Sequence, residues 1–332
     1  MKRVKIIAEA GVNHNGSFRL AKRLVDVACE AGADAIKFQT YLTEALVTKH
    51  AQKAEYQRRN TKSATSQFEM LKKLELNHAD VRRLFAYCQE KNITFLSSPF
   101  DMESVEFLQD LGMELFKIPS GEITDYLYLK KIATYRKPIL LSTGMATSNE
   151  IKEALAILEP NDQITLLHCT SDYPAAMKEV NLNAMCSMKS TFQKQVGYSD
   201  HTLGMEVAIA AVALGACVIE KHITLDPTLP GPDQCVSLAP SELKQFVHAI
   251  RNIEEAIGDG EKRPTESELK NKVAVRKSLV AREPIRKGEP FTMSNVDAKR
   301  PGTGISPMNY EMILGKTAKR DYNIDDLIEY DE

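Results

Sequence analysis

A short unit that occurs three times constrains the fold of this chain more than any other feature. In each copy a helix-like run ends at a glycine, a short apolar strand follows, and a charged residue stands five positions after the glycine. The copies are Ala31–Lys37, Leu111–Lys117 and Leu214–Glu220. Glycine adopts the left-handed conformation that ends a helix at little cost. A repeated unit of this kind predicts a βα architecture.

Eight strand-like segments alternate with helix-like segments over residues 1–258. They are Val4–Ala8, Ala33–Lys37, Ile93–Leu96, Met113–Lys117, Pro138–Leu141, Ile164–Leu167, Val196–Tyr198 and Ala216–Ile219. This order and length favour an α/β fold of the (β/α)8 TIM-barrel type, with one site at the carboxyl ends of the strands. An open doubly wound sheet is the alternative, but no dinucleotide-binding fingerprint follows the first strand. The long polar segment 41–66 is predicted to be a lid or binding loop.

The composition limits the partners that the chain can have. The sequence is 43% hydrophobic and 27% charged, with a net charge of −2, which gives no general attraction to nucleic acid or to anionic membranes. No apolar run approaches the length of a membrane span. Because a strand begins almost directly after Met1, we expect no signal peptide. The six cysteines have no metal-like or redox-like spacing, so we expect reduced thiols and a cytoplasmic protein.

The carboxyl-terminal part of the chain has a different character. Residues 259–275 are predicted to be a linker, and residues 276–332 a small β-rich domain with strand-like pieces at Ser278–Ala281 and Pro290–Thr292. A basic, glycine-rich loop covers Lys299–Gly304. A domain near the lower size limit for independent stability is expected to dock on another surface.

Two histidines follow consecutive predicted strands. His201 and His222 would face the same barrel mouth, with Asp200, Glu220 and Asp233 near them in the sequence. Imidazole and carboxylate ligands, completed by water, suit Mn²⁺ or a related divalent ion. The alternative is a pair of hydrogen-bonded histidines without a metal. No pair of thiolates is available for a structural zinc.

Lysines and serines follow several of the other strands. Lys37 and Lys117 could form an anion pocket with hydroxyl donors from Ser98, Ser120, Ser142 and Ser199. Alternatively, the lysines are solvated, or are paired with Glu9 or Glu122. Glu122, in a tight turn after the fourth strand, is a candidate general base, or else an acid that caps the following helix.

These motifs together resemble those of the sialic acid synthases, which include bacterial N-acetylneuraminate synthases and their legionaminic acid relatives. The matching stretches are Gly11–Gly16, Lys37–Thr40, Ser98–Phe100, Lys117–Glu122, Leu141–Met145, Ser199–Thr202, Glu220–His222, Gly231–Asp233 and Lys299–Gly302. The resemblance extends into the carboxyl-terminal region, which is similar to the SAF (antifreeze-like) domain of that family.

The resemblance implies a reaction and a set of site residues. Phosphoenolpyruvate would condense with the open-chain aldehyde of an N-acylmannosamine, giving a nine-carbon 2-keto acid and phosphate. His201 and His222 would hold a divalent metal, typically Mn²⁺, with Mg²⁺ or Co²⁺ as alternatives. The implied phosphoenolpyruvate contacts are Lys37, Ser98, Lys117, Ser120 and Ser199. The implied sugar contacts are Gln39, Asn60, Tyr173, Asp233 and Arg300. Glu122 would act in proton transfer, and the SAF domain would reach across a homodimer.

The identity of the sugar stays open at this stage. We expect N-acetylneuraminate as the product; the alternative is a legionaminic acid synthase that uses 2,4-diacetamido-2,4,6-trideoxymannose. Three positions depart from patterns common in the family, namely Asn15, Ser171 and Gln234. Two other classes of function are alternatives. One is a Schiff-base aldolase with Lys37 or Lys117 as nucleophile, and the other is a non-catalytic sugar-binding or ice-binding module.

Overall fold

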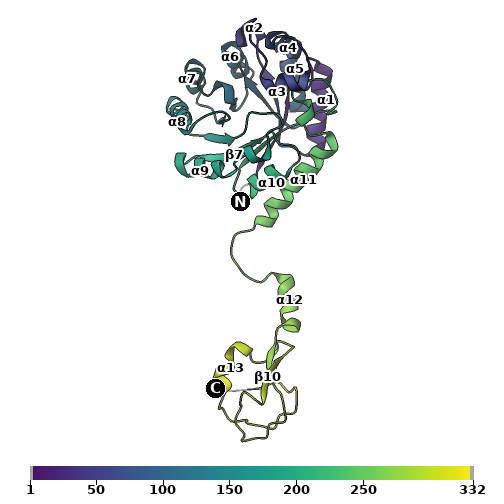
Figure 1. Cartoon of the computed structure of the whole chain (residues 1–332), viewed down its shortest axis with the longest axis vertical. Coiled ribbons are helices and arrows are strands. Elements are labelled where there is room, and N and C mark those ends of the chain that lie inside the picture. The colour runs from purple at the N-terminus through teal and green to yellow at the C-terminus, as the bar shows by residue number, and fades with distance from the viewer. Residues whose placement is uncertain (1–2, 330–332) are drawn as a thin grey trace. The chain divides into compact units, whose positions relative to one another are not determined.

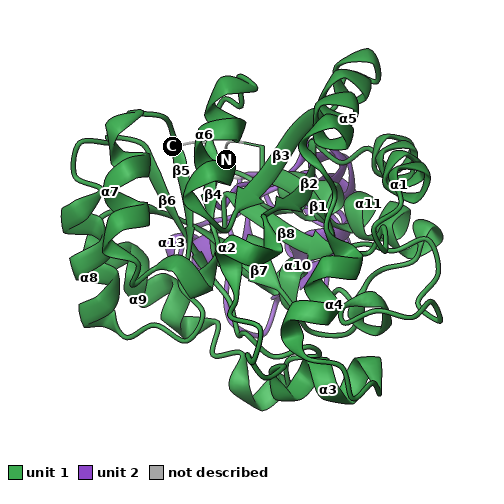
Figure 2. Cartoon of the chain, turned by 90° about the horizontal axis from the view of Figure 1, so that it is seen from above, with its two compact units in different colours: residues 1–259 green, residues 260–332 purple. Residues whose placement is uncertain are grey.

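The computed structural model describes residues 3–329. The chain divides into two compact units, residues 1–259 and residues 260–332, coloured separately in Figure 2. No helix among the described residues is long and apolar enough to cross a membrane.

The first unit is built on eight parallel strands in the order β3-β2-β1-β8-β7-β6-β5-β4. They are β1 Lys5–Gly11, β2 Ala35–Thr40, β3 Thr94–Pro99, β4 Phe116–Ile118, β5 Ile139–Ser142, β6 Ile164–His168, β7 Gln195–Asp200 and β8 Val218–His222. The first strand pairs with the last, Lys5 opposite Val218 and Glu9 opposite His222. Strands β3 and β4 lie against each other and close the ring. The predicted TIM barrel is therefore confirmed.

Helices surround the strands on the outside (Figures 1 and 2). The outer helices are α1 Phe18–Ala31, α5 His78–Glu90, α6 Met102–Asp110, α7 Tyr126–Thr134, α8 Ser148–Ile157, α9 Asn183–Phe192, α10 Glu206–Ala213 and α11 Pro240–Ile257. Each packs an apolar face against the sheet, as α1 does with Leu24 and Val25, which are fully buried. Gly32 ends α1 with φ of 80°, and its N–H bonds the carbonyls of Ala28 and Cys29. The repeated glycine thus ends a helix as predicted.

The segment after β2 is longer and more ordered than a simple loop. It contains α2 Thr43–Leu46, α3 Glu55–Thr61 and α4 Gln67–Leu74. Ser66 caps α4 through the N–H of Glu69, whose carboxylate returns a bond to the Ser66 N–H. Short 3-10 turns occur at Ser120–Glu122, Met177–Glu179 and Gln234–Val236 in the barrel, and at Pro307–Asn309 in the second unit.

The second unit has its own small core. Strands β9 Ser278–Ala281 and β10 Val296–Lys299 pair antiparallel, and α13 Tyr310–Ile313 follows them. The strand predicted at Ser278–Ala281 is confirmed. Pro290–Thr292, also predicted as strand-like, makes only an isolated bridge between Pro290 and Thr317. Within the predicted linker, residues 259–275, the chain forms the exposed helix α12 Glu266–Val275, which Thr265 caps.

Candidate active site

The inside of the barrel is arranged in two layers. The lower layer is apolar and contains Ile7, Ala35, Leu96, Leu140, Leu167 and Val218. Because side chains alternate along a strand, the residues two positions later face the same interior. Those residues are Glu9, Lys37, Ser98, Ser142, Cys169 and Glu220. The alternation of side chains along the strands therefore places the polar residues in one layer. This layer lies above the apolar layer, toward the carboxyl ends of the strands.

A buried cluster of alternating charges forms the floor of this polar layer. Lys37 Nζ lies 2.9 Å from Glu9 Oε2 and 3.6 Å from Glu220 Oε2, and it donates to Ser98 Oγ at 3.1 Å. Lys117 Nζ lies 3.4 Å from Glu220 Oε1, which also accepts from Ser199 Oγ at 3.0 Å. The lysines are thus not solvated. Lys37 pairs with Glu9, one of the alternatives that the sequence left open, and both lysines pair with Glu220.

The two carboxylates of this floor differ in electrostatics. Burial opposes the charge of Glu220, but Lys117 and Lys37 overcome it and lower the pKa of Glu220 to about 2. Burial dominates at Glu9 and raises its pKa to about 7, although Lys37 opposes this shift. Burial also lowers the pKa of Lys117. Glu220 is therefore ionised near neutral pH and balances the charge of both lysines. Glu9 is the carboxyl group that can gain or lose a proton near neutral pH.

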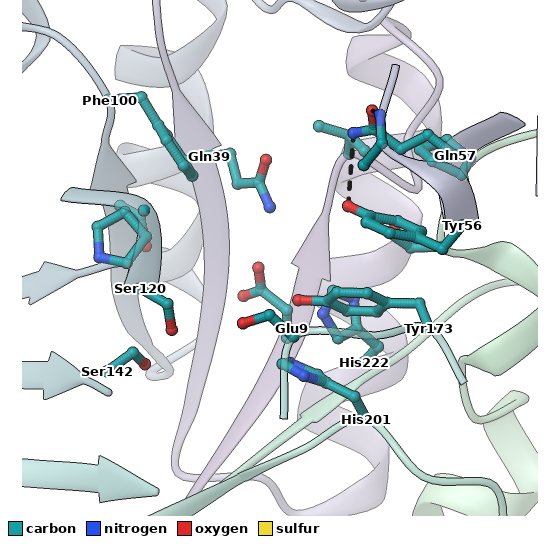
Figure 3. A pocket seen from close by; sticks show the side chains of 18 of the residues that line it. Glu9, Gln39, Tyr56, Gln57, Phe100, Ser120, Ser142, Tyr173, His201 and His222 are labelled. Carbon is teal, nitrogen blue, oxygen red and sulfur yellow. Dashed lines mark hydrogen bonds between the residues drawn. The ribbon is translucent and has the colours of Figure 1, made fainter. Parts of the chain in front are cut away.

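The two histidines lie at the edge of the same floor, as Figure 3 shows. The ring centroids of His201 and His222 are 5.5 Å apart. Tyr173 covers both, at 4.2 Å from the His201 ring and 5.5 Å from the His222 ring. Burial lowers the pKa of His201 to about 4 and that of His222 well below its usual value. Both imidazoles are therefore neutral near pH 7, the form that binds metal.

The chemistry of these side chains fits a divalent ion in part. His201 Nδ1 bonds the Thr170 carbonyl at 2.7 Å, so Nε2, which lies 3.4 Å from Ser199 Oγ, is the ring nitrogen that could bind a metal. His222 Nδ1 is buried without a hydrogen-bond partner among residues 3–329. Asp200 is committed elsewhere, because its carboxylate accepts from Lys221 and Thr202. No group of three or more His, Cys, Asp or Glu side chains suited to a metal occurs within the described chain. The protein thus offers two nitrogen ligands and leaves other positions to substrate or water.

A cavity of about 650 Å³ opens above the floor. Ten of the predicted site residues line it, namely Lys37, Gln39, Ser98, Lys117, Ser120, Tyr173, Ser199, His201, His222 and Asp233. Asp233 is 6% exposed, one of its carboxylate oxygens lacks a partner among the described residues, and burial raises its pKa to about 7. The structure thus brings together residues predicted at or after the ends of six strands, with Asp233 from the loop after β8.

Three predicted residues lie outside this lining set. Glu122 lies in the turn Ser120–Glu122, where burial, and then Asp125 and Asp101, raise its pKa to about 7. Asn60, on α3, donates to the carbonyls of Tyr173 at 3.1 Å and Pro232 at 2.7 Å. Arg300 belongs to the second unit, where its Nε donates to the Val275 carbonyl at 2.9 Å.

Helix α3 forms a strap over the cavity. Asn60 joins it to the loops after β6 and β8, and Arg59 adds bonds to the Tyr173 carbonyl at 2.9 Å and to Asp172 at 3.3 Å. The Tyr56 ring packs on the Tyr173 ring at 4.6 Å. Asn60 therefore holds the strap in place with both of its amide hydrogens, instead of pointing its amide into the cavity.

Comparison with known proteins identifies the family to which the chain belongs. Residues 24–262 match the NeuB family, and residues 276–332 match the SAF domain. The chain belongs to the NeuB family. It is 53% identical over 332 residues to the N,N'-diacetyllegionaminic acid synthase of Campylobacter jejuni, covering 99% of both chains. It is 47% identical over 316 residues to the enzyme of that name from Legionella pneumophila, covering 93% of this chain and 89% of the other.

A solved structure of a sialic acid synthetase agrees with the fold. The N-acetylneuraminic acid synthetase of Leptospira borgpetersenii, in complex with citrate, matches with a TM-score of 0.71 and 35% identity, over 81% of this chain and 90% of that chain. The resemblance to sialic acid synthases, including the SAF domain, is confirmed at the level of the family.

Sequence reasoning missed two contributors to this NeuB site. Glu9 was weighed only as a possible partner of a lysine, although it lies in the polar layer and lines the cavity. Its position two residues after the buried Ile7 is the signal that could have identified it. Tyr56 also lines the cavity. Its contact with Tyr173 depends on the path of the strap, which no local pattern reveals.

Proposed function

We propose that this NeuB protein condenses phosphoenolpyruvate with 2,4-diacetamido-2,4,6-trideoxymannose, with uptake of one water, to form N,N'-diacetyllegionaminic acid and phosphate. The observation that carries the proposal is the 53% identity, over 99% of both chains, to a synthase of that name. N-acetylneuraminate, the product expected first from the sequence, becomes the second candidate, supported by the 35% identical Leptospira protein. An apolar lining formed by Met70, Leu71 and Leu74 also favours a deoxygenated, twice-acylated sugar.

The charged floor is suited to the phosphoenolpyruvate anion. Lys37 and Lys117 supply point charges, and Ser98, Ser120 and Ser199 supply hydroxyl donors, all of them lining one cavity. An entering anion would compete with Glu9 and Glu220 for the lysines. Because Glu9 has a pKa raised to about 7, it can take up a proton and release Lys37 to the ligand. The floor can therefore accept an anion without leaving a buried carboxylate unpaired.

The neutral histidines and Tyr173 would orient the sugar aldehyde above the floor. We propose that His201 and His222 hold a divalent ion, Mn²⁺ or alternatively Mg²⁺ or Co²⁺, which would polarise that aldehyde as a Lewis acid. The unpartnered His222 Nδ1 and the two neutral imidazoles support this assignment. Asp233 and Gln39, which line the same cavity, are proposed to bind the sugar hydroxyls and amide. The proton-transfer role of Glu122 stays a prediction, since that side chain does not line the cavity.

We further propose a cytoplasmic homodimer in which the SAF domain of one chain completes the site of the other through Arg300. The guanidinium offers several donors in one plane, which suits hydroxyls and an acyl carbonyl. All six cysteines are free, which supports a reducing compartment.

The test is turnover with defined substrates. Purified protein is incubated with phosphoenolpyruvate and either 2,4-diacetamido-2,4,6-trideoxymannose or N-acetylmannosamine, and released phosphate is measured. We expect a higher kcat/KM for the diacetamido sugar; a higher value for N-acetylmannosamine would overturn the assignment. Borohydride added during turnover should trap no adduct on Lys37 or Lys117, whereas a Schiff-base aldolase would be trapped.

Metal dependence is tested separately. Chelation should abolish phosphate release, and Mn²⁺ should restore it. The double change His201→Ala, His222→Ala should abolish metal binding in a calorimeter while leaving the barrel folded. Full turnover by the chelated enzyme would contradict the metal proposal.

A further inference from the structure

One side of the cavity is lined by apolar side chains, for which the proposed reaction centre has no use. A separate apolar cluster, distinct from the main core, contains Val12, Tyr41, Leu46, Met70, Leu71, Leu74 and Phe100. Every one of these side chains also lines the cavity. Most come from residues 41–74, the excursion after β2 that carries α2, α3 and α4. We call the cavity-lining residues of this excursion the 41–74 wall. Apolar side chains give a charged anion nothing, and Arg59, a cation of the wall, is paired with Asp172, so this wall suits the sugar better than the anion.

Two polar groups of the wall keep free hydrogen-bonding capacity. Gln67 Nε2 donates to Gln57 Oε1 at 3.3 Å, and Gln57 Nε2 donates to the Tyr56 hydroxyl at 3.4 Å, the bond drawn in Figure 3. The Gln67 carbonyl oxygen accepts no hydrogen bond, and the Tyr56 hydroxyl donates none, within residues 3–329. This hydrogen-bonded chain therefore leaves the Tyr56 hydroxyl free to donate and the Gln67 oxygen free to accept, and both residues line the cavity.

These groups complement an acetamido group. An acetamide has one N–H donor, one carbonyl acceptor and one methyl group. The Gln67 oxygen can accept the N–H, the Tyr56 hydroxyl can donate to the carbonyl, and Met70, Leu71 and Leu74 offer apolar surface to the methyl. Tyr56 and Gln67 are half-buried, and a site that pairs both polar atoms of a ligand discriminates against ligands that lack them.

The position of the wall selects the acetamido group that it can bind. The Tyr173 ring contacts both the His201 ring and the Tyr56 ring. Tyr173 therefore lies between the histidines and the wall (Figure 3). A sugar whose C1 aldehyde is at the histidines keeps its C2 substituent near the floor. Its C4 substituent, two carbons further along the sugar, would extend past Tyr173 toward the residues of α3 and α4 that line the cavity.

We propose that the 41–74 wall is a subsite for the C4 acetamido group of the sugar, with Tyr56 and Gln67 as its polar contacts. This assignment rests on the proposed function, since N-acetylmannosamine has only a hydroxyl at C4. It makes the strap a determinant of which sugar is used, in addition to a cover of the reaction centre.

The experiment isolates the C4 group by a matched pair of sugars. The probes are 2,4-diacetamido-2,4,6-trideoxymannose and 2-acetamido-2,6-dideoxymannose, which differ only in carrying an acetamido group or a hydroxyl at C4. The ratio of their kcat/KM values is measured for the wild-type protein, for Tyr56→Phe and for Gln67→Leu. Tyr56→Phe keeps the ring contact with Tyr173, and Gln67→Leu keeps the side-chain size. The control is Gln52→Leu, an exposed glutamine of the same segment that does not line the cavity.

We expect each variant to reduce the preference for the diacetamido sugar about fivefold, the effect of losing one hydrogen bond. The rate with the 4-hydroxy sugar and the KM for phosphoenolpyruvate should stay unchanged, and Gln52→Leu should match the wild type. A ratio unchanged in both variants would overturn the subsite while leaving the proposed function intact. An equal loss with both sugars would also overturn it, by placing the C2 acetamido group at the wall. A wild-type preference for N-acetylmannosamine in the earlier assay would overturn both.

Discussion

The substitution Asp233→Asn tests the electrostatics of the site through stability. Asp233 is buried, and one of its oxygens has no partner among the described residues, so burial raises its pKa from 3.8 to about 7. Between those values the folded state binds a proton that the unfolded state has lost. The free energy of unfolding therefore falls as pH rises from about 4 to about 7. An asparagine at this position is neutral at every pH and removes this contribution.

The magnitude follows from the size of the shift. With 1.36 kcal/mol per pKa unit, Asp233 should lower the free energy of unfolding by about 2.5 kcal/mol between pH 5 and pH 8. Glu9 and Glu122 have raised pKa values as well and contribute in the same direction, so only the difference between variant and wild type is diagnostic.

The assay is urea denaturation of the full-length protein at pH 5 and at pH 8, with unfolding monitored by circular dichroism. The wild type should lose more stability over this interval than Asp233→Asn, by about 2.5 kcal/mol. Asp162→Asn, which alters an exposed aspartate, is the control and should behave as the wild type. If Asp233→Asn lost as much stability as the wild type, Asp233 would be ionised in the folded protein and the assignment of its raised pKa would be wrong.

Replacing Lys117 with methionine should raise the KM for phosphoenolpyruvate about tenfold or more, because a buried charge-assisted contact is lost, with little change in the KM for the sugar. An unchanged phosphoenolpyruvate KM would exclude Lys117 from the anion pocket. Asn60→Ala should release the strap from the Tyr173 and Pro232 carbonyls, raising the sugar KM and speeding proteolysis within residues 47–66. Arg58→Ala, which alters an exposed side chain on the same helix, is its control, and equal behaviour of the two variants would refute the role of Asn60. Arg300→Ala and His222→Ala proteins, each nearly inactive, should regain activity when their subunits are allowed to exchange. Demonstrated exchange without recovery would show that Arg300 does not act across the dimer.

The floor of the site could be predicted because it depends on local rules. Lys37, Lys117 and Glu220 each stand at the same place in a repeated unit, and strand period two then directs them into the barrel. The family resemblance added residues from the loops, such as Tyr173 and Asp233, which do line the cavity.

What the sequence did not reveal depends on contacts between distant segments. The pairing of Glu9 with Lys37 requires the register of β1 against β2, in which these two residues are partners. The role of Asn60 depends on carbonyls more than a hundred positions away, at Tyr173 and Pro232. In the second unit, Lys299 was assigned to a loop, yet it ends β10 opposite Ser278. Local pattern cannot supply such pairings, because they are fixed by tertiary packing.

The position of Glu220 on the last strand has a consequence for the biosynthesis of the chain. Lys37 and Lys117 emerge from the ribosome long before the carboxylate that they share. A nascent chain that ends before β8 still has Glu9 to pair with Lys37, but Lys117 lacks its carboxylate, and a buried cation without a partner is costly. Insertion of β8 between β1 and β7 both completes the ring and neutralises its interior. A chain truncated before β8 should therefore be an open product that proteases cleave more readily than the full-length barrel.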